Sequence, residues 1–345
     1  MSSGTTWRRA SIALLVVGAL VAPAPAAQAR VGHIPRGGKV LSFAREPASV
    51  SVEGSVLAWS KRTGCPAGLK HCYQGLIRIG SKTVATPGVL ADADIDLGRG
   101  ATGKIAAAYV RCSAAGGCSA YSFDPAALLE TKLPLTVTAG CRPAAPRIAG
   151  TNVAYIQTGK GCGAPGLYVA DAPTGAVGWQ AWKTADDLEA AGTDELVGGT
   201  LYWSTTLGLE AESRKHPDRI YSGRLDTHAQ APINSGTPFA YYDFESLSVG
   251  GNRLFHLLNF SGDEQGASVS IAYQTIAGPQ RYCRLKGFGT SFDPAVPRNL
   301  PLGIAADGSY LYVVLAREDT ASKDHPNQLI RYRLSSLKRT CRSTR

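Results

Sequence analysis

Charged residues that precede a recurring apolar segment are the side chains best placed to bind a ligand. One lies about five to six positions before each copy, or within a longer connection before it. If the copies pack radially, these positions cross one face beside a central channel, where loops on a rigid scaffold usually bind ligands. We expect a mixed-charge funnel for a polar ligand; the alternative is ordinary solvation of strand entries. The candidate ligand-binding residues are Glu46, Asp92, Arg142, Asp187, Asp243 and Arg298.

Three carboxylates at alternate positions suggest one metal site. Asp92, Asp94 and Asp96 would share a face of a predicted strand, and calcium prefers such oxygen ligands. The spacing lacks the Gly and Glu of an EF-hand loop, so a solvated strand entry is the simpler interpretation. We therefore predict no cofactor and no metal, with a structural calcium near these residues as the alternative.

Catalytic motifs are missing from the sequence. The segment Gly98–Lys104 nearly spells a phosphate-binding loop, but Ile105 stands where Ser or Thr would bind magnesium, and a strand-like segment follows. The sequence contains no Gly-x-Ser-x-Gly and no His-Glu-x-x-His motif, and no cysteine is free if all eight pair. No catalytic residue is predicted.

Several histidines and tryptophans have simpler structural interpretations. His216 and His325 precede prolines at predicted hairpin tips, where turn formation is favoured over a shared ligand or metal site. His256 lies in a predicted core strand. Trp179 and Trp182 fall outside the recurring aromatic position, so they fit either a sugar-stacking surface or, as we favour, packing at a sheet edge.

The elements that must position these residues are repeats of one phrase. A hydrophobic residue, a glycine turn and an apolar run with an aromatic recur every 45 to 55 residues, and an alternating strand follows each copy. Four short antiparallel strands per unit are typical of a propeller blade, so the sequence predicts an all-β, six-bladed β-propeller. The hydrophobic residues that begin the phrases are Val52, Leu97, Ile148, Val197, Val249 and Ile304.

Two of these units resemble a known family. Leu167–Gly175, LYVADAPTG, resembles the strand and turn of TolB-like six-bladed propellers, and Ala306–Tyr312, ADGSYLY, resembles their Asp-Gly turn and inner strand. The family includes periplasmic binding proteins and the non-catalytic propellers of peptidases. The resemblance implies a fold and an extracytoplasmic setting, and it carries over no functional residue.

Both ends of the chain are expected to close the ring. Lys39–Arg45 alternates like a strand and precedes the first unit, so we predict that it completes unit six and removes an open edge. The carboxyl-terminal tail can then reach unit five. From this layout we expect four disulfides, although eight cysteines allow 105 pairings. The expected bridges are Cys65–Cys72, Cys112–Cys118, Cys141–Cys162 and Cys283–Cys341.

The amino terminus and the composition indicate the setting. Residues 1–29 have a basic start, an apolar centre and a small-residue cleavage site, which predicts a secretory signal peptide, with an uncleaved anchor as the alternative. Residues 30–345 would form one propeller domain, with no later transmembrane segment. Eight cysteines fit an oxidising, extracytoplasmic compartment.

The charge balance narrows the partners. Removal of Arg8 and Arg9 lowers the formal net charge from +10 to +8, an excess that favours anionic polysaccharide, teichoic-type polymers or lipid headgroups, with simple solubility as the alternative. No basic stripe interleaved with aromatics appears, so nucleic acid is not an expected partner. The oligomeric state stays open.

Three function classes follow. We expect a secreted, non-catalytic binding protein that recognises an extracellular polymer, peptide or protein on its upper face. The alternative is a polysaccharide lyase or hydrolase, which would need Arg142, Arg298 and a carboxylate to converge in one pocket. A purely structural envelope protein would have no concave pocket.

Overall fold

The computed structural model divides the chain into residues 1–30 and 31–345, and only the second unit is described below. It describes residues 37–67, 69, 71–113, 117–159, 161–183, 189–207, 220–233, 242–262, 266–278, 281–285, 288, 298–318 and 327–343. The predicted signal peptide, Asp187, His216 and His325 therefore lie outside the described residues.

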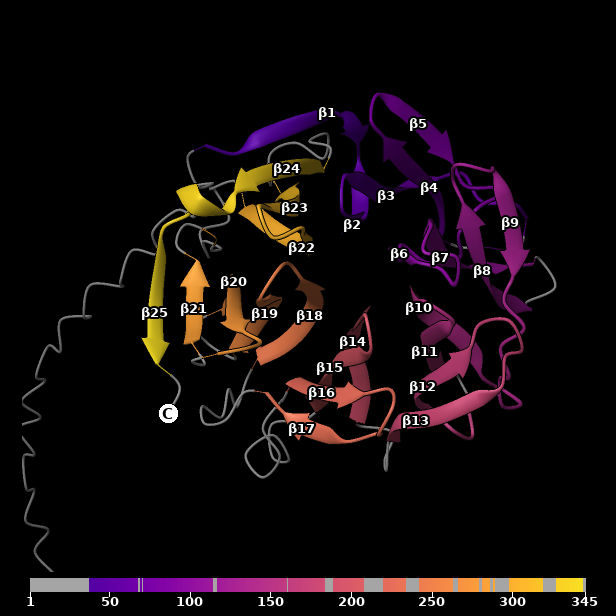
Figure 1. The fold of residues 1–345 in the computed structure, drawn as a ribbon. Helices are drawn as coiled ribbons and strands as arrows, with labels where there is room; N and C mark the ends of the chain where they lie inside the picture. The colour runs from indigo at the N-terminus through magenta and orange to yellow at the C-terminus, as the bar shows by residue number, and fades with distance from the viewer. Residues whose placement is uncertain are drawn as a thin grey trace, which may run out of the picture. The chain divides into compact units, whose positions relative to one another are not determined.

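The described strands form six antiparallel sheets arranged in a ring, which confirms the predicted six-bladed all-β propeller (Figure 1). Branched and aromatic residues alternate along the strands, and short glycine turns join them, as expected for blades whose two faces are both covered. The first three blades each follow chain order from the inner to the outer strand. Their strands are β2 (Pro47–Glu53), β3 (Val56–Thr63), β4 (Cys72–Ile79) and β5 (Lys82–Ala85); β6 (Ile95–Arg99), β7 (Ile105–Cys112), β8 (Cys118–Asp124) and β9 (Leu129–Lys132); and β10 (Arg142–Ala149), β11 (Asn152–Thr158), β12 (Gly166–Asp171) and β13 (Val177–Lys183).

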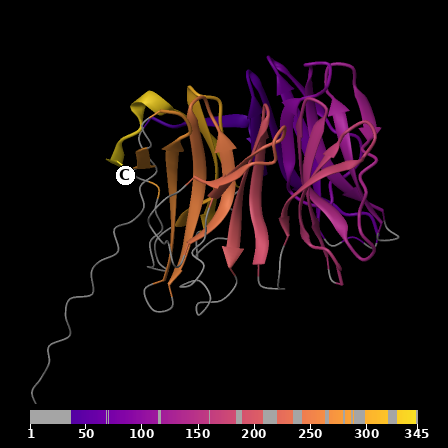
Figure 2. The ribbon, with the colours of Figure 1, turned by 60° about the horizontal axis from the view of Figure 1, so that its bottom comes forward.

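The other three blades differ only at their outer edges. Blade four is again a simple meander, whereas blades five and six each receive a strand from one end of the chain. Figure 2 shows strands of neighbouring blades running side by side in the same general direction. The elements are β14 (Glu189–Val197), β15 (Thr200–Leu207), β16 (Ile220–Arg224) and β17 (Gln230–Pro232); β18 (Tyr242–Val249), β19 (Arg253–Gly262), β20 (Gly266–Thr275), β21 (Arg281–Leu285) and β25 (Arg339–Ser343); and β22 (Arg298–Ala306), β23 (Tyr310–Glu318), β24 (Gln328–Arg333), β1 (Lys39–Arg45) and the 3-10 turn η1 (Leu334–Ser336).

Apolar side chains between adjacent blades form the core. The recurring aromatic of the second strand is buried in every blade, where it packs against the neighbouring sheet. Burial of one such ring removes a large apolar area from water, so this single repeated position fixes the spacing of the blades. The six aromatics are Trp59, Tyr109, Tyr155, Trp203, Phe255 and Tyr312.

Both chain ends take part in closing the ring, as predicted. Strand β1 pairs antiparallel with β24 and becomes the outer strand of blade six. Strand β25 pairs with β21 as a fifth strand of blade five, with Cys341 directly opposite Cys283. The two terminal segments therefore cover the outer edges of adjacent blades.

All four expected disulfides are present: Cys65–Cys72, Cys112–Cys118, Cys141–Cys162 and Cys283–Cys341. The first two close the loop between the second and third strands of blades one and two, and the last joins β21 to β25. A bridge restricts the unfolded chain more strongly when it closes a longer loop, so the last bridge contributes most by this criterion.

The inner strands approach closely at the centre of the ring. Gly98 in β6 lies so near β10 that an added Cβ atom would stand 1.8 Å from the carbonyl oxygen of Ile148. The next residues extend the contact, because Gly150 donates its N–H to the carbonyl oxygen of Arg99. This packing brings the polar side chains of successive inner strands within reach of one another.

Candidate functional site

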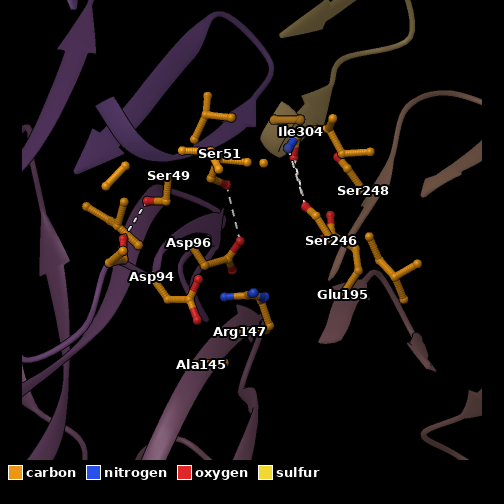
Figure 3. A pocket seen from close by; sticks show the side chains of 18 residues that line it. Ser49, Ser51, Asp94, Asp96, Ala145, Arg147, Glu195, Ser246, Ser248 and Ile304 are labelled. Carbon is orange, nitrogen blue, oxygen red and sulfur yellow. Dashed lines mark hydrogen bonds between the residues drawn. The ribbon is translucent and has the colours of Figure 1, made fainter. Parts of the chain in front are cut away.

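A cavity of about 230 Å³ lies where the inner strands of all six blades meet. Its wall contains side chains from β2, β6, β10, β14, β18 and β22, together with Ala93 and Asp94 just before β6. Polar groups converge on it from several blades (Figure 3). They include Ser51, Asp94, Asp96, Arg147, Glu195 and Ser248.

Arg147 is the cation of this cavity. Its Nε donates a hydrogen bond to the backbone carbonyl of Asp194 at 3.0 Å and lies 3.9 Å from Oδ1 of the same residue. Figure 3 shows the guanidinium beside the carboxylates of Asp94 and Asp96, which come from the neighbouring blade. The Asp194 side chain is fully buried, and neither of its carboxylate oxygens accepts a hydrogen bond within the described part of the chain.

Burial and crowding of carboxyl groups raise their pKa values. Desolvation raises the pKa of Asp194 to about 7 although Arg147 opposes the shift. Desolvation and the charge of Asp96 raise the pKa of Glu195 to about 8. Desolvation also raises the pKa of Asp96, again against Arg147. Glu195 in the cavity wall, and Asp194 beside Arg147 but outside that wall, therefore change charge near neutral pH.

Burial acts on the pKa of the Arg147 guanidinium in the opposite direction, because it disfavours the protonated form. Desolvation lowers the pKa of Arg147, but the surrounding carboxylates, Asp194 foremost, raise it more, so its net shift is upward. Arg147 is thus charged at every physiological pH, whereas the ionisation of Asp194 and Glu195 varies across that range. The charge of the cavity is set by the number of carboxyl groups that lose a proton.

Hydrogen bonds between neighbouring blades hold these side chains in place. Ser51 Oγ donates to Asp96 Oδ1 at 3.2 Å and accepts from the Leu97 N–H at 2.9 Å, which joins blade one to blade two. Asp96 Oδ2 accepts from the Ile148 N–H of blade three at 3.4 Å. In the sequence these polar residues stand directly beside apolar ones, and in the ring they lie at contacts between adjacent blades that border the cavity.

The same arrangement continues around the ring. Glu195 Oε1 accepts from the Val249 N–H at 3.5 Å, which links blades four and five. Ser248 Oγ accepts from the Ala306 N–H at 3.0 Å, which links blades five and six. The polar side chains of the cavity are therefore also the connections between its walls, and their positions are fixed by the closed ring.

The predicted funnel residues lie at or near the entries of the inner strands, farther out than the cavity. Glu46 is exposed between β1 and β2 with a left-handed φ of 48°, and Arg142 is exposed at the start of β10. Neither lines the cavity. Asp243 and Arg298 begin or nearly begin β18 and β22, but their side chains, like all of Asp187, lie outside the described residues.

The structure brings two of the funnel residues together. Desolvation raises the pKa of Asp92 to about 7, the charge of Asp94 adds to the shift, and the charge of Arg142 opposes it. Asp92 Oδ1 is buried without a hydrogen-bond partner in the described chain. The funnel as a ligand site stays a prediction.

The expected strand of alternating aspartates is corrected by the structure. Asp92 lies in a bend and Asp94 in the irregular segment before β6, and of the three only Asp96 is part of the strand. They therefore do not share a strand face, because the chain turns before it enters the sheet. Among the described residues, no group of three or more Asp, Glu, His or Cys side chains is arranged to hold a metal ion.

Sequence reasoning missed Arg147, Asp194 and Glu195. The predicted funnel charges stand five to six positions or more before each inner-strand hydrophobic residue, whereas the buried charges lie one to three positions before it: Asp96 before Leu97, Arg147 before Ile148, and Asp194 and Glu195 before Val197. A charge inside an apolar run that forms an inner strand was the available signal.

The other sequence candidates take structural roles. Ile105 begins strand β7, so the near phosphate-binding loop is a hairpin turn. Trp179 is buried against Trp203 and stacks on His228, and Trp182 packs on Tyr221, as expected for packing at a sheet edge. His256 is buried, and desolvation lowers its pKa to about 3.

No protein-family model and no curated protein matches the chain. Among solved structures it is similar to TolB from Acinetobacter baumannii, with 15% identity, a TM-score of 0.48, and coverage of 83% of this chain and 65% of TolB. It is also similar to the β-propeller domain of the Trilobed protease from Pyrococcus furiosus, with 7% identity, a TM-score of 0.46, and coverage of 86% and 94%. A third similar structure is the Pyrococcus horikoshii acylaminoacyl peptidase, with 10% identity, a TM-score of 0.48, and coverage of 86% of this chain and 52% of the peptidase.

The chain thus spans 65% of the length of TolB and about half of that peptidase. The strand topology, with six antiparallel blades in a ring, confirms the TolB-like propeller architecture expected from the sequence.

Proposed function

We propose that this protein is a secreted, non-catalytic binding protein that holds a small cationic group of its ligand, such as the ammonium of a lysine side chain, in the central cavity. The observation that carries the proposal is the charge of the cavity. In the described part of the chain, the carboxyl groups of Asp94, Asp96, Asp194 and Glu195 surround the single guanidinium of Arg147.

The size of the cavity fits a head group rather than a polymer. About 230 Å³ is the volume of roughly eight water molecules at about 30 Å³ each. An ammonium or guanidinium group would enter as a cation, lower the pKa values of Asp194 and Glu195, and release protons. The surrounding peptide would then contact the upper face, where the predicted funnel residues lie.

The same charge balance argues against a lyase for anionic polysaccharides. Such an enzyme needs an arginine that is free to neutralise substrate carboxylates, beside a general base. Arg147 is already surrounded by carboxylates, and Arg142 does not line the cavity. An anionic substrate would meet repulsion from the excess acidic groups.

The extracytoplasmic setting is supported by the cysteines. All eight form disulfides, which persist in oxidising compartments. In the described part of the chain, no helix has the length and apolarity to cross a bilayer.

Calorimetric titration tests the proposal with two small probes, N-acetyl-lysine methylamide and its uncharged counterpart N-acetyl-norleucine methylamide. We expect binding of the lysine compound only, with affinity that rises from pH 6 to pH 8.5 and with proton release that depends on the buffer. The double variant Asp94→Asn/Glu195→Gln should lose this binding.

A surface variant provides the matched control. Glu53→Gln removes one carboxylate from an exposed ion pair with Arg99, outside the cavity, and should bind as the parent does. Equal binding of the two probes, or unchanged binding by the double variant, would refute the cationic ligand.

A further inference from the structure

Seven exposed basic side chains lie on the two outermost strands of blades five and six and on the segment between β24 and β25. The segments that carry them, 37–45, 281–285 and 327–343, contain no Asp or Glu. We call these seven residues the basic rim: Lys39, Arg45, Arg281, Arg284, Arg333, Lys338 and Arg339.

The strand register makes most of the rim continuous. Lys39 in β1 is directly opposite Arg331 in β24, so Arg333 is its diagonal neighbour on the same face. The chain then passes through η1 to Lys338 and Arg339. Arg339 is opposite Leu285 in β21, whereas Arg284 is opposite Thr340, so the rim reaches both faces of this sheet edge. Figure 1 shows β1, β24, β25 and β21 at the outer side of two adjacent blades.

The rim is electrostatically unfavourable by itself. Opposite positions such as Lys39 and Arg331 place like charges across a strand pair, which destabilises a sheet. Arg331 is accommodated over the ring of Tyr310, at 4.6 Å from its centroid. The ion pairs formed among the described residues lie elsewhere, at Arg99, Arg111, Arg147 and Arg224.

Protection of sheet edges does not require this many charges. A single lysine on an edge strand already discourages pairing with another chain. The outer strands of the first four blades carry at most one lysine each: β5 carries Lys82, β9 carries Lys132 with Glu130, β13 carries Lys183, and β17 carries no charge. The rim therefore exceeds what edge protection explains.

We propose that the basic rim is a docking surface for a linear anionic polymer outside the cytoplasm. A chain of repeating carboxylate, sulfate or phosphate groups can follow the strands and the turn between them, and it gains entropy by releasing counterions. The disulfide Cys283–Cys341 fixes β25 to β21, so the charges on both strands are held in place before binding.

A flat membrane surface fits the rim less well. The strands that carry the charges lie at the outer edges of two successive blades of a ring, and these edges face different directions (Figure 1). Phe43, the exposed aromatic of β1, packs on Trp59 and lies beneath the guanidinium of Arg78 at 4.0 Å. It is therefore engaged within the fold and does not extend outward as a membrane anchor.

Two variants with the same change in net charge test the rim. The rim variant is Arg284→Gln/Arg333→Gln/Lys338→Gln/Arg339→Gln, and the control is Lys82→Gln/Lys104→Gln/Lys132→Gln/Lys183→Gln, which changes exposed lysines of the first three blades. The probes are heparin, polygalacturonate and polyphosphate, with vesicles of phosphatidylglycerol and phosphatidylcholine as the membrane probe. Unfolding curves of both variants establish that each is folded.

The expected result is binding of the parent to at least one soluble polymer, with affinity that falls as salt rises. The rim variant should lose at least tenfold in affinity, with a log–log salt slope flatter by roughly three to four, about one for each contact removed. The control should stay within about twofold of the parent. Equal losses of affinity in both variants would mean that only the net charge matters. Binding to vesicles alone would make the rim a membrane-binding surface. Either result overturns the proposal.

Discussion

Arg147 is the residue on which the central cavity depends most directly. Its guanidinium is the counter-ion for buried carboxyl groups of blades two and four. Replacement by Met keeps much of the volume but leaves those groups without a cation. We expect Arg147→Met to lower the free energy of unfolding at pH 7 by about 3–5 kcal/mol, as for other buried pairs broken on one side.

Urea unfolding measures this loss against a surface control. Arg99→Met breaks an ion pair whose arginine side chain is 59% exposed, so it should cost less than about 1 kcal/mol. If the two variants are equally stable, Arg147 does not act as a buried counter-ion.

The same carboxyl groups predict how stability depends on pH. Asp194 and Glu195 have pKa values raised to about 7 and about 8 in the folded protein, above their unfolded values. The folded state therefore binds more protons than the unfolded state between pH 4 and pH 8. Their contribution is complete below about pH 4 and is lost as pH rises through 7 and 8.

We accordingly expect the urea midpoint to fall between pH 5 and pH 8.5 because of these two groups. Glu195→Gln should flatten that dependence, whereas Glu53→Gln at the exposed ion pair should leave its slope unchanged. A parent-like slope in Glu195→Gln would show that this carboxyl group ionises freely in the folded protein.

The sequence could not identify these buried charges, for a geometric reason. In an isolated strand, a charge next to an apolar residue simply faces away from the core. Only closure of six inner strands converts that outward face into the wall of a channel. Arg147 and Glu195 therefore look like solvated residues until the ring is formed, whereas the aromatic positions were recognisable from one repeat.

At the scale of an element, one close contact between blades depends on a glycine. A Cβ atom at position 98 would stand 1.8 Å from the carbonyl oxygen of Ile148, so β6 and β10 would have to separate. We expect Gly98→Ala to cost about 1–3 kcal/mol or more, the usual range for overpacking. Gly178→Ala in β13, where nothing lies within 4 Å, should be nearly neutral in the same denaturation assay.

The disulfide at the carboxyl terminus and the disulfide in the hairpin of blade one should differ in their contribution to stability. Cys283–Cys341 closes a separation of 58 residues and Cys65–Cys72 one of 7. The chain-entropy relation gives about 4 kcal/mol for the longer loop and about 2.5 kcal/mol for the shorter. Paired Cys→Ala variants should therefore lose stability in that order, and the reverse order would mean that folded-state interactions of the bridges outweigh loop entropy.

Most elements could be predicted because each repeat carries its own signal. The strand containing Leu167–Ala170 and the turn at Asp307-Gly308 combine alternation with a glycine turn, and both were found where expected. The irregular segment at Asp92 and Asp94 was not, since alternating aspartates fit a strand as well as a turn. Short polar segments lack the apolar periodicity that distinguishes the two.

At the scale of the whole molecule, the ring depends on a strand from the amino terminus. Strand β1 buries Leu41 and Ala44 against blades one and six and occupies the outer edge beside β24. Its role was predictable because the last unit lacked a fourth strand. The leftover cysteines indicated that the carboxyl-terminal tail reaches blade five, but not that the tail adds the strand β25.

Removal of residues 1–45 should therefore open the sixth blade without deleting any other strand. We expect a lower unfolding midpoint and concentration-dependent association, because β24 would present unpaired backbone groups at a free edge. A synthetic peptide of residues 37–46, added in excess, should restore the monomer and raise the midpoint by adding the missing strand. The matched control peptide carries Leu41→Asp and Ala44→Asp, which places charges in the buried positions of β1.

Size-exclusion chromatography measures the association, and thermal unfolding measures the midpoint. If the truncated protein stays monomeric and equally stable, or if both peptides act alike, β1 does not close the ring; rescue by the parent peptide alone would show that pairing with β24 holds blades six and one together.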